Sequence, residues 1–291
     1  MNALLAVVAV LGVSASGPLM AATNAPVLAI AFWRNAAATV VLAPVAAVRS
    51  RAELRALDAR HLSLTLAAGV FLAGHFATWV GSLQLTSVAA ATALVTTQLV
   101  WVVLLDRWRG QPVAARVLVG CAVSVVGVLV VSGVDFAVST RALVGDGLAV
   151  LGGLFAAMYL VAGERVRTRL STTAYTTVCY GTCALVLLLA SLAAGVDLVG
   201  LDARDWLLIG AVTVCAQLLG HSLINHLLAV MSPLVISLLL LLEVPGAALL
   251  AAVALGQSPP AGVYAGLALV LAGLVVVVLS RRPADQQPLE V

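Results

Sequence analysis

The chain has 291 residues, of which 63% are hydrophobic and only 9% are charged, and its formal net charge is +3. Soluble domains carry roughly 25% charged residues, so this sequence has too few polar side chains to cover a surface that faces water. All of its basic residues are arginine, which excludes the lysine of a P-loop or of a Schiff-base enzyme. A net charge this small does not indicate nucleic-acid binding.

Ten long apolar segments follow one another along the chain. Each is long enough to cross a hydrocarbon core of about 30 Å as a helix, and the short links between them make consecutive helices antiparallel. Only Met1 and Asn2 precede the first segment, without the basic residues of a signal peptide, so we interpret it as a span. The predicted spans are residues 3–22, 26–48, 62–83, 86–105, 113–133, 145–162, 172–194, 205–227, 232–254 and 260–280.

The arginines outside these spans indicate the orientation of the chain. Only Arg141 and Arg204 lie on the side opposite to the termini. Because arginine accumulates on the cytoplasmic side of a membrane, both termini are predicted to be cytoplasmic. The arginines on the side of the termini are Arg49, Arg51, Arg55, Arg60, Arg107, Arg109, Arg116, Arg165, Arg167, Arg169, Arg281 and Arg282.

The second half of the chain repeats the first at an offset of 145 or 146 residues. His75 recurs as His221, and Gln98 recurs as Glu243. Each half holds five spans, and an odd number of spans inverts the second half relative to the first. An inverted repeat of this kind is typical of secondary transporters.

The sequence therefore predicts an all-α integral membrane protein with ten transmembrane helices. Residues 1–138 form the first five-helix repeat and residues 139–282 form the second, inverted one, with a central cavity between them. Residues 283–291 form a short, polar cytoplasmic tail.

Small residues predict where the fifth and tenth spans pack closely against a neighbour. Glycine lets two helix backbones approach each other in lipid, and the spacing of these glycines recurs in both halves. The glycines are Gly120, Gly127, Gly262, Gly266 and Gly273.

Three prolines lie inside predicted spans. Pro18, Pro44 and Pro245 each remove a backbone donor and weaken the helix locally. Proline is frequent in membrane helices, so these positions are either kinks with no special role or hinges of a moving helix.

Two charged residues lie deep in the apolar spans, where a charge costs at least ~2.5 kcal/mol. Arg34 is either a structural residue bound to backbone carbonyls or a cation of the cavity. Glu243 is either a tie at the helix broken by Pro245 or a relay for a proton or cation. Its repeat partner Gln98 is neutral, and pairing between Arg34 and Glu243 is left open.

Polar and aromatic residues also mark a predicted substrate pathway. His75 shares a helix face with Trp79, and His221 shares one with Asn225, because each pair is four residues apart. They either tie helices together or line one cavity from opposite ends, and Tyr159 is a further lining candidate. No metal site is expected, since no histidine or carboxylate accompanies the cysteines.

Several stretches resemble the EamA family of the drug/metabolite transporter superfamily. The motif Phe32-Trp33-Arg34 is similar to the aromatic-arginine motif of that family's second helix, and Leu242-Glu243-Val244-Pro245 to the Glu-Pro stretch of its ninth. Tyr159 stands where the family's sixth helix usually carries a tyrosine. The link Leu83-Gln84-Leu85-Thr86-Ser87-Val88-Ala89 is also similar, and the resemblance covers about residues 3–280.

The chain departs from that family at two places. The Gly-Glu that usually ends helices four and nine reads Gly110-Gln111 and Gly256-Gln257. The proline common near the end of helix four is absent, and Gln98-Leu99 stands there instead.

The resemblance implies ten helices around a central cavity in a bacterial cytoplasmic (inner) membrane, with helices five and ten as a packing or dimer seam. It also implies export of small metabolites, such as amino acids or drug-like compounds, driven by a proton or cation gradient or by the substrate gradient alone. The expected partners are a small-molecule substrate, the lipid bilayer and a second copy in a homodimer, with no nucleic acid and no cofactor.

Two other classes of protein remain open at this point. An integral-membrane enzyme acting on lipid-linked substrates usually carries clustered acids or histidines in sizeable loops, and no such cluster or catalytic residue is found. A non-transporting membrane sensor would not require Arg34, Glu243 and the histidines within the spans.

Overall fold

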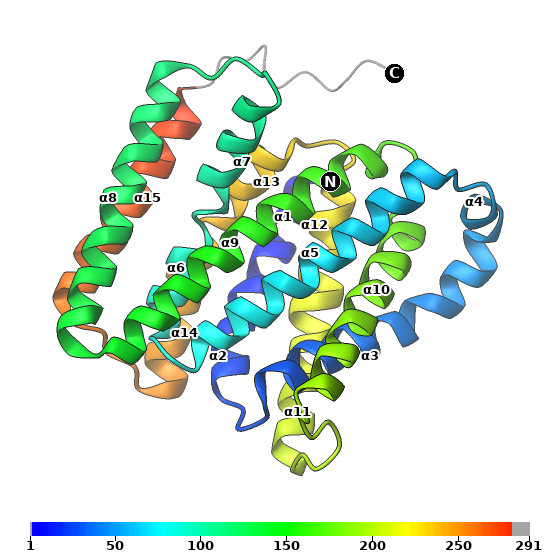
Figure 1. The fold of residues 1–291 in the computed structure, drawn as a ribbon, viewed down its shortest axis with the longest axis horizontal. Coiled ribbons are helices and arrows are strands. Elements are labelled where there is room, and N and C mark those ends of the chain that lie inside the picture. Colours follow the sequence, from blue (N-terminus) through cyan, green and yellow to red (C-terminus); the bar gives the residue numbers. More distant parts are fainter. Residues whose placement is uncertain (1, 281–291) are drawn as a thin grey trace.

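The structure is a computed structural model that describes residues 2–280, without the side chains of residues 131–138, 234, 238, 274 and 278. Throughout these residues the regular elements are helices (Figure 1). The predicted tail 283–291 and two of the predicted cytoplasmic arginines, Arg281 and Arg282, lie outside the described residues.

The first half of the chain forms eight helices. Asp58 caps α5 by accepting hydrogen bonds from the backbone N–H of His61, at 2.8 Å, and from its ring. These bonds hold the pKa of the Asp58 carboxyl below its ordinary value. The helices are α1 (Asn2–Ser14), α2 (Ser16–Ala21), α3 (Val27–Arg49), α4 (Arg51–Arg55), α5 (Ala59–Leu83), α6 (Val88–Val95), α7 (Gln98–Trp108) and α8 (Ala115–Val138).

The second half also consists of helices. A π-helical stretch, η1, joins α11 to α12 without a gap, so the three elements together occupy the eighth predicted span. The elements are α9 (Thr140–Arg167), α10 (Thr172–Ala193), α11 (Ala203–Val212), η1 (Thr213–His221), α12 (Ser222–Leu227), α13 (Pro233–Leu240), α14 (Glu243–Leu255) and α15 (Ala261–Leu279).

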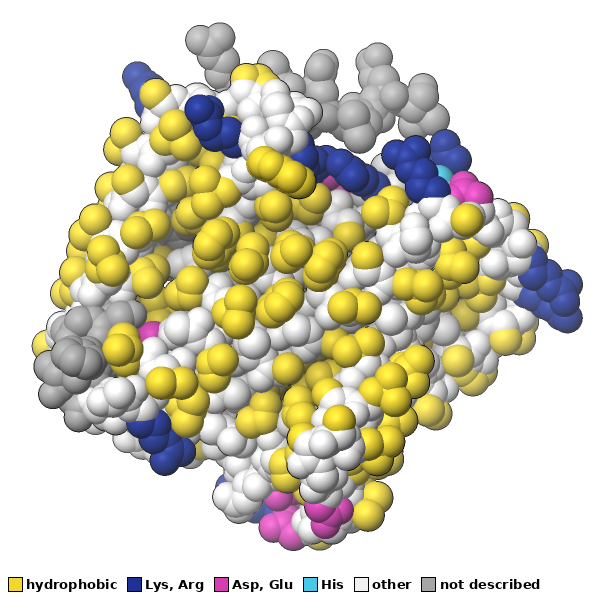
Figure 2. Space-filling view, viewed as in Figure 1, with side chains coloured by type: hydrophobic (Ala, Val, Ile, Leu, Met, Phe, Trp, Pro, Cys, Tyr) yellow, Lys and Arg dark blue, Asp and Glu magenta, His cyan; other side chains and the backbone are white. Residues whose placement is uncertain are grey.

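Seven stretches of helix in the described residues are long and apolar enough to cross a membrane. They correspond to the predicted spans one to four and six to eight, and the other three predicted spans contain the shorter apolar helices 115–130, 243–255 and 261–277. Apolar side chains are spread over the whole middle of the molecular face in Figure 2, while arginines and acids lie near its edges. The chain is therefore an all-helical, multi-pass membrane protein.

The two halves interlock instead of standing apart. α3 packs on α10, α5 packs on α9 and α10, and α1 packs on η1. α8 lies beside α15 along its whole length, and this pair stands at one side of the molecule (Figure 1). Most helices of the first half thus find their main partner in the second half.

The predicted glycines explain the close approach of α8 and α15. A Cβ on Gly120 would lie 2.5 Å from the carbonyl oxygen of Gly273, and one on Gly127 would lie 2.8 Å from that of Gly266. Ser124 donates a hydrogen bond of 3.2 Å across the seam to the Val270 carbonyl. The seam therefore joins two helices of one chain.

Gly262, the fifth predicted glycine, lies half-buried in the first turn of α15. Its contribution to helix packing stays a prediction.

Replacing Gly120 with alanine should destabilise the protein, because the new methyl group has no room between the two backbones. Overpacking of this kind costs about 1–3 kcal/mol, which a thermal melt in detergent would show as a lower midpoint. Gly147→Ala is the matched control, since no heavy atom lies within 4 Å of a Cβ placed there. Equal thermal midpoints for the two variants would show that α8 and α15 can move apart at Gly120 without loss of stability.

Two membrane helices are broken near their middle, at positions related by the repeat. α6 ends at Val95 and α7 begins at Gln98, while α13 ends at Leu240 and α14 begins at Glu243. Pro245 lies in the first turn of α14, where its missing N–H is not needed. The break between α13 and α14 therefore lies just before this proline.

The break between α6 and α7 has no proline. The hydroxyls of Thr96 and Thr97 each donate a 2.6 Å hydrogen bond to a backbone carbonyl one turn back, and such local bonds bend helices. Gly153 of α9 lies against the break, since a Cβ there would be 2.8 Å from the Val95 carbonyl oxygen. A glycine at this position lets α9 support the break.

The other two predicted hinges differ from each other. Pro18 lies in the short helix α2, directly after the interruption at Ala15. α3 continues through Pro44 without interruption.

Candidate functional site

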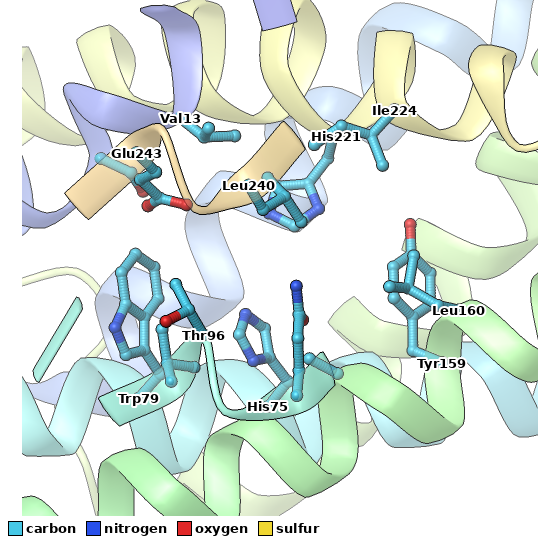
Figure 3. Close-up of a pocket in the computed structure, with 14 residues that line it drawn as sticks. Val13, His75, Trp79, Thr96, Tyr159, Leu160, His221, Ile224, Leu240 and Glu243 are labelled. Atoms are coloured by element: carbon cyan, nitrogen blue, oxygen red, sulfur yellow. The ribbon is translucent and has the colours of Figure 1, made fainter. Parts of the chain in front are cut away.

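A cavity lies at the centre of the molecule, where the two helix breaks face α5 and α9. Glu243 and Leu240 border it from one side, and His75, Trp79 and Tyr159 border it from the other (Figure 3). The residues that line it come from both halves of the chain, and they are Val13, Ser16, His75, Trp79, Val95, Thr96, Gln98, Ala156, Tyr159, Leu160, His221, Ile224, Leu240 and Glu243.

The cavity brings together six of the eight residues predicted for the substrate pathway. Gln98 and Glu243 are the first residues of α7 and α14, so the breaks present both side chains to the same space. Arg34 and Asn225 lie beside the cavity and bind residues that line it. The lining residues among the eight are His75, Trp79, Gln98, Tyr159, His221 and Glu243.

The two histidines are direct neighbours. Their ring centroids are 6.3 Å apart. Of the two roles that the sequence left open, one placed His75 and His221 at opposite ends of the cavity. His75 also stacks on Trp79, with centroids 5.6 Å apart and ring planes inclined by 14°. His75 and His221 extend toward each other from opposite walls of the cavity (Figure 3).

A backbone carbonyl fixes the tautomer of His75. Its Nδ1 lies 3.0 Å from the carbonyl oxygen of Gly152, and because a carbonyl only accepts, Nδ1 must carry the proton. In the neutral ring Nε2 is then the acceptor. His75 thus offers the cavity a hydrogen-bond acceptor beside the indole of Trp79.

Arg34 is completely buried next to the cavity. Its Nε donates to Oε1 of Gln217 at 2.9 Å, and one of its terminal nitrogens donates to Ser16 at 3.3 Å and to the sulfur of Met20 at 3.4 Å. The guanidinium carbon lies 4.0 Å from the centre of the Phe76 ring, a favourable cation–π contact. The other terminal nitrogen has no hydrogen-bond partner among the described residues.

Gln217, the main partner of Arg34, was not predicted from the sequence. Its amide nitrogen donates to Oδ1 of Asn35 at 3.1 Å, which orients the amide so that its oxygen faces Arg34. Gln217 lies in η1, and π-helical turns are frequent at functional sites. The signal was present in the sequence, because Gln217, His221 and Asn225 follow one another at four-residue spacing.

Arg34 and Glu243 do not form an ion pair in this structure. Of the described residues, only His61–Asp58 and Arg109–Asp106 form ion pairs within 4.0 Å. Glu243 is buried, with 7% of its surface exposed. The cavity therefore has a cation behind one wall and a separate carboxyl group in another.

Asn225 connects three helices instead of lining the cavity. Its side-chain oxygen accepts a hydrogen bond of 2.6 Å from Tyr159, and its side-chain nitrogen donates one of 3.2 Å to Tyr180. The backbone carbonyl of Asn225 also accepts a bond of 2.7 Å from Arg167. The sequence left two roles open for Asn225, and this geometry corresponds to the first of them, a tie between helices.

The contrast between Asn225 and Trp79 gives a test of these roles. Asn225→Ala should lower the thermal midpoint, because it leaves the buried hydroxyl of Tyr159 without its partner, at about 1–3 kcal/mol. Trp79→Phe should leave the midpoint nearly unchanged, since the indole nitrogen has no partner in the described residues, but should impair transport. A stable Asn225→Ala variant, or full transport by Trp79→Phe, would contradict this assignment.

The described residues contain no group of three or more histidine, cysteine, aspartate or glutamate side chains that could hold a metal ion. Cys179 and Cys183 are buried in α10 among apolar neighbours. The side chains that line the cavity offer hydrogen-bonding groups, a carboxyl group and aromatic surface.

Apolar helices that cross the membrane several times, with a mixed polar and aromatic cavity between two halves, define a membrane protein of the transporter class. A model of the EamA-like transporter family matches residues 1–133 and 143–279, one match to each half, and the chain belongs to this family. The family is one of transporters and not of enzymes.

Other comparisons support the fold alone. One crystal structure is similar with a TM-score of 0.68 and 18% sequence identity, over 97% of this chain and 98% of the other. No curated protein matches the chain.

Proposed function

We propose that this protein is a secondary active transporter that exports small metabolites, such as amino acids or drug-like compounds, by alternating access. The observation that carries this proposal is the central cavity, which lies between two broken helices at repeat-related positions. Transporters with inverted repeats bind substrate where the repeats meet, at discontinuous helices.

Ten membrane-spanning helices in two inverted repeats, residues 1–138 and 139–282, agree with several paired features. The breaks at residues 96–97 and 241–242 are 145 residues apart, and Gly110 and Gly256, both at positive φ, end the broken helices 146 residues apart. The proposed boundary between residues 138 and 139 falls between α8, which ends at Val138, and α9, which begins at Thr140.

Both termini are proposed to face the cytoplasm of a bacterial inner membrane. One end of the molecule holds a cleft bordered by Arg60, Arg109, Arg165 and Arg169, whereas fewer arginines are visible at the other end (Figure 2). This distribution matches the arginine excess of cytoplasmic loops.

Cysteine labelling in intact cells would test the orientation. Ala52→Cys should be protected from an impermeant thiol reagent, and Thr140→Cys should react, because the two exposed positions lie at opposite ends of the molecule. The reverse pattern would overturn the topology.

The cavity supports coupling to a proton or cation. Glu243 is the carboxyl group in its lining, and Arg34, behind the wall, can balance a negative charge on Glu243 or on a substrate. The external faces of α8 and α15 carry exposed valines and leucines, which suit lipid or a second copy in a homodimer.

Transport by purified protein in lipid vesicles would test the function. The substrates to assay are the metabolites that accumulate in cells lacking the protein and fall when it is restored. Accumulation that depends on the protein and saturates with substrate is expected. Metabolite levels that do not respond to the protein, together with no vesicle transport of amino acids or drug-like cations, would contradict the proposal.

A further inference from the structure

The side chain of Gln257 connects the two broken helices at the end of the molecule opposite the arginine-rich cleft. Its Oε1 accepts a hydrogen bond of 3.0 Å from the backbone N–H of Val88, the first residue of α6. The first N–H groups of a helix have no partner within the helix, so Gln257 satisfies one of them. α6 and α14 pack against each other at this end.

The chain reaches this contact through a turn at Gly256. This glycine ends α14 with φ +64°, a conformation that favours glycine, and places Gln257 directly after the helix. The same arrangement ends α7, where Gly110 has φ +81° and Gln111 follows. The two Gly-Gln pairs are 146 residues apart.

The acceptor helix is also repeated. Ser87 caps α6 by accepting a hydrogen bond of 3.1 Å from the N–H of Ala90, and Ser232 accepts one of 3.4 Å from Val235 at the start of α13. Gln111 and Ser232 line the arginine-rich cleft together. In the part of the chain that the structure describes, the Gln111 side chain binds nothing.

We propose that Gln257 is a latch that holds the outer gate closed, where the outer gate is the contact between α6 and α14. Gln111 is its inner counterpart, which docks on the start of α13 when the corresponding contact at the inner end closes. This inference rests on the proposed function, because it assigns the two contacts to alternating states of one transport cycle. In this structure the outer latch is made, and the inner glutamine faces an open cleft.

The two latches are not equivalent. Val88, the donor of the outer latch, corresponds by the repeat to Pro233, which has no N–H. Gln111 must therefore reach a donor further along α13. The outer closed state thus has a bond at the first helical position that the inner closed state lacks, which biases the resting protein toward outer closure.

A buried reporter cysteine measures how often the outer gate opens. Thr92 is fully buried in α6, with its hydroxyl beside Gly17 of α2, so Thr92→Cys should react with an impermeant thiol reagent from outside only when the outer end of α6 moves away from the helices around it. The reaction is followed on right-side-out vesicles, and labelling of the same chain without Thr92→Cys is subtracted to remove the native cysteines.

Removing the latch from either side should have the same effect. Gln257→Leu loses the acceptor, and Val88→Pro loses the donor at a helical position that tolerates proline well. Each should raise the labelling rate of Thr92→Cys by roughly 3- to 10-fold, the equilibrium effect of one hydrogen bond. The two changes together should raise it no further, whereas Gln257→Glu keeps an acceptor and should stay near the original rate.

Gln84→Leu is the matched control. Gln84 also binds backbone at the outer end, donating to the Ala25 carbonyl at 3.3 Å, but it does not bridge α6 and α14. Its loss should leave labelling unchanged. In the Gln257→Leu background, Gln111→Leu should return labelling toward the original rate, because the inner closed state then loses its own latch.

Several results would overturn the proposal. These are unchanged labelling in both Gln257→Leu and Val88→Pro, additive effects of the two, or an equal rise in Gln84→Leu. Labelling needs no substrate, so it separates the latch from the proposed function. Altered labelling in a protein that transports nothing would refute the function alone, and normal transport with unaltered labelling would refute the latch alone.

Discussion

Replacing Arg34 with leucine should abolish transport while leaving the protein folded in the membrane. The change leaves the buried oxygen of Gln217 without a donor, at about 1–3 kcal/mol, and loses the weaker contacts with Ser16 and Phe76, but it also removes a buried charge that costs at least about 2.5 kcal/mol in a membrane. These two effects nearly cancel, so the thermal midpoint should change little. The variant loses the positive charge that Arg34 places beside the cavity.

Arg34→Lys provides the matched comparison. Lysine keeps the charge but lacks the planar fork with which Arg34 binds Gln217 and Ser16 at once. We expect partial transport from this variant, measured in vesicles at equal protein amounts. If Arg34→Leu fails to fold while Arg34→Lys transports normally, Arg34 is a structural tie and not a cation of the cavity.

Replacing Glu243 with glutamine should abolish transport driven by a pH gradient. One pH unit is worth about 1.4 kcal/mol per proton, so coupling to one proton should sustain roughly tenfold substrate accumulation. In inside-out vesicles with an acidic interior, the original protein should reach this level, whereas the variant should only equilibrate substrate. Glutamine has nearly the shape of glutamate but cannot bind and release a proton.

Glu164→Gln is the control for this experiment, because Glu164 lies in the arginine-rich cleft and not in the central cavity. It should retain accumulation driven by the pH gradient. Full accumulation by Glu243→Gln, or equal losses in both variants, would assign Glu243 a structural role and remove the basis for proton coupling through it.

The sequence predicted the segments of this fold better than their internal breaks. Hydropathy located the apolar segments because lipid selects side chains over about 20 residues at a time. Pro245 predicted an interruption in the ninth segment, but no proline marks the one at Thr96 and Thr97. That break depends on hydroxyl groups bound to the backbone and on contact with Gly153, which only the packed structure shows.

The site was predicted in composition but not in arrangement. Counting polar residues in apolar spans found Arg34 and Glu243, because charges are rare in lipid. Which partner each one takes depends on helix rotation and crossing, so the bond from Arg34 to Gln217 and the role of Asn225 did not follow from spacing. The π-helix η1 adds to this difficulty, since it changes the helix periodicity on which face assignments rely.

The seam between α8 and α15 has a consequence for the biogenesis of the protein. Gly120 meets Gly273, so the binding surface of α8 is completed only after a further 153 residues have been synthesised. At about 5–20 residues per second, this takes roughly 8 to 30 s. During that time the glycine surface of α8 faces lipid or an insertion factor, and the first half of the chain cannot complete its tertiary packing.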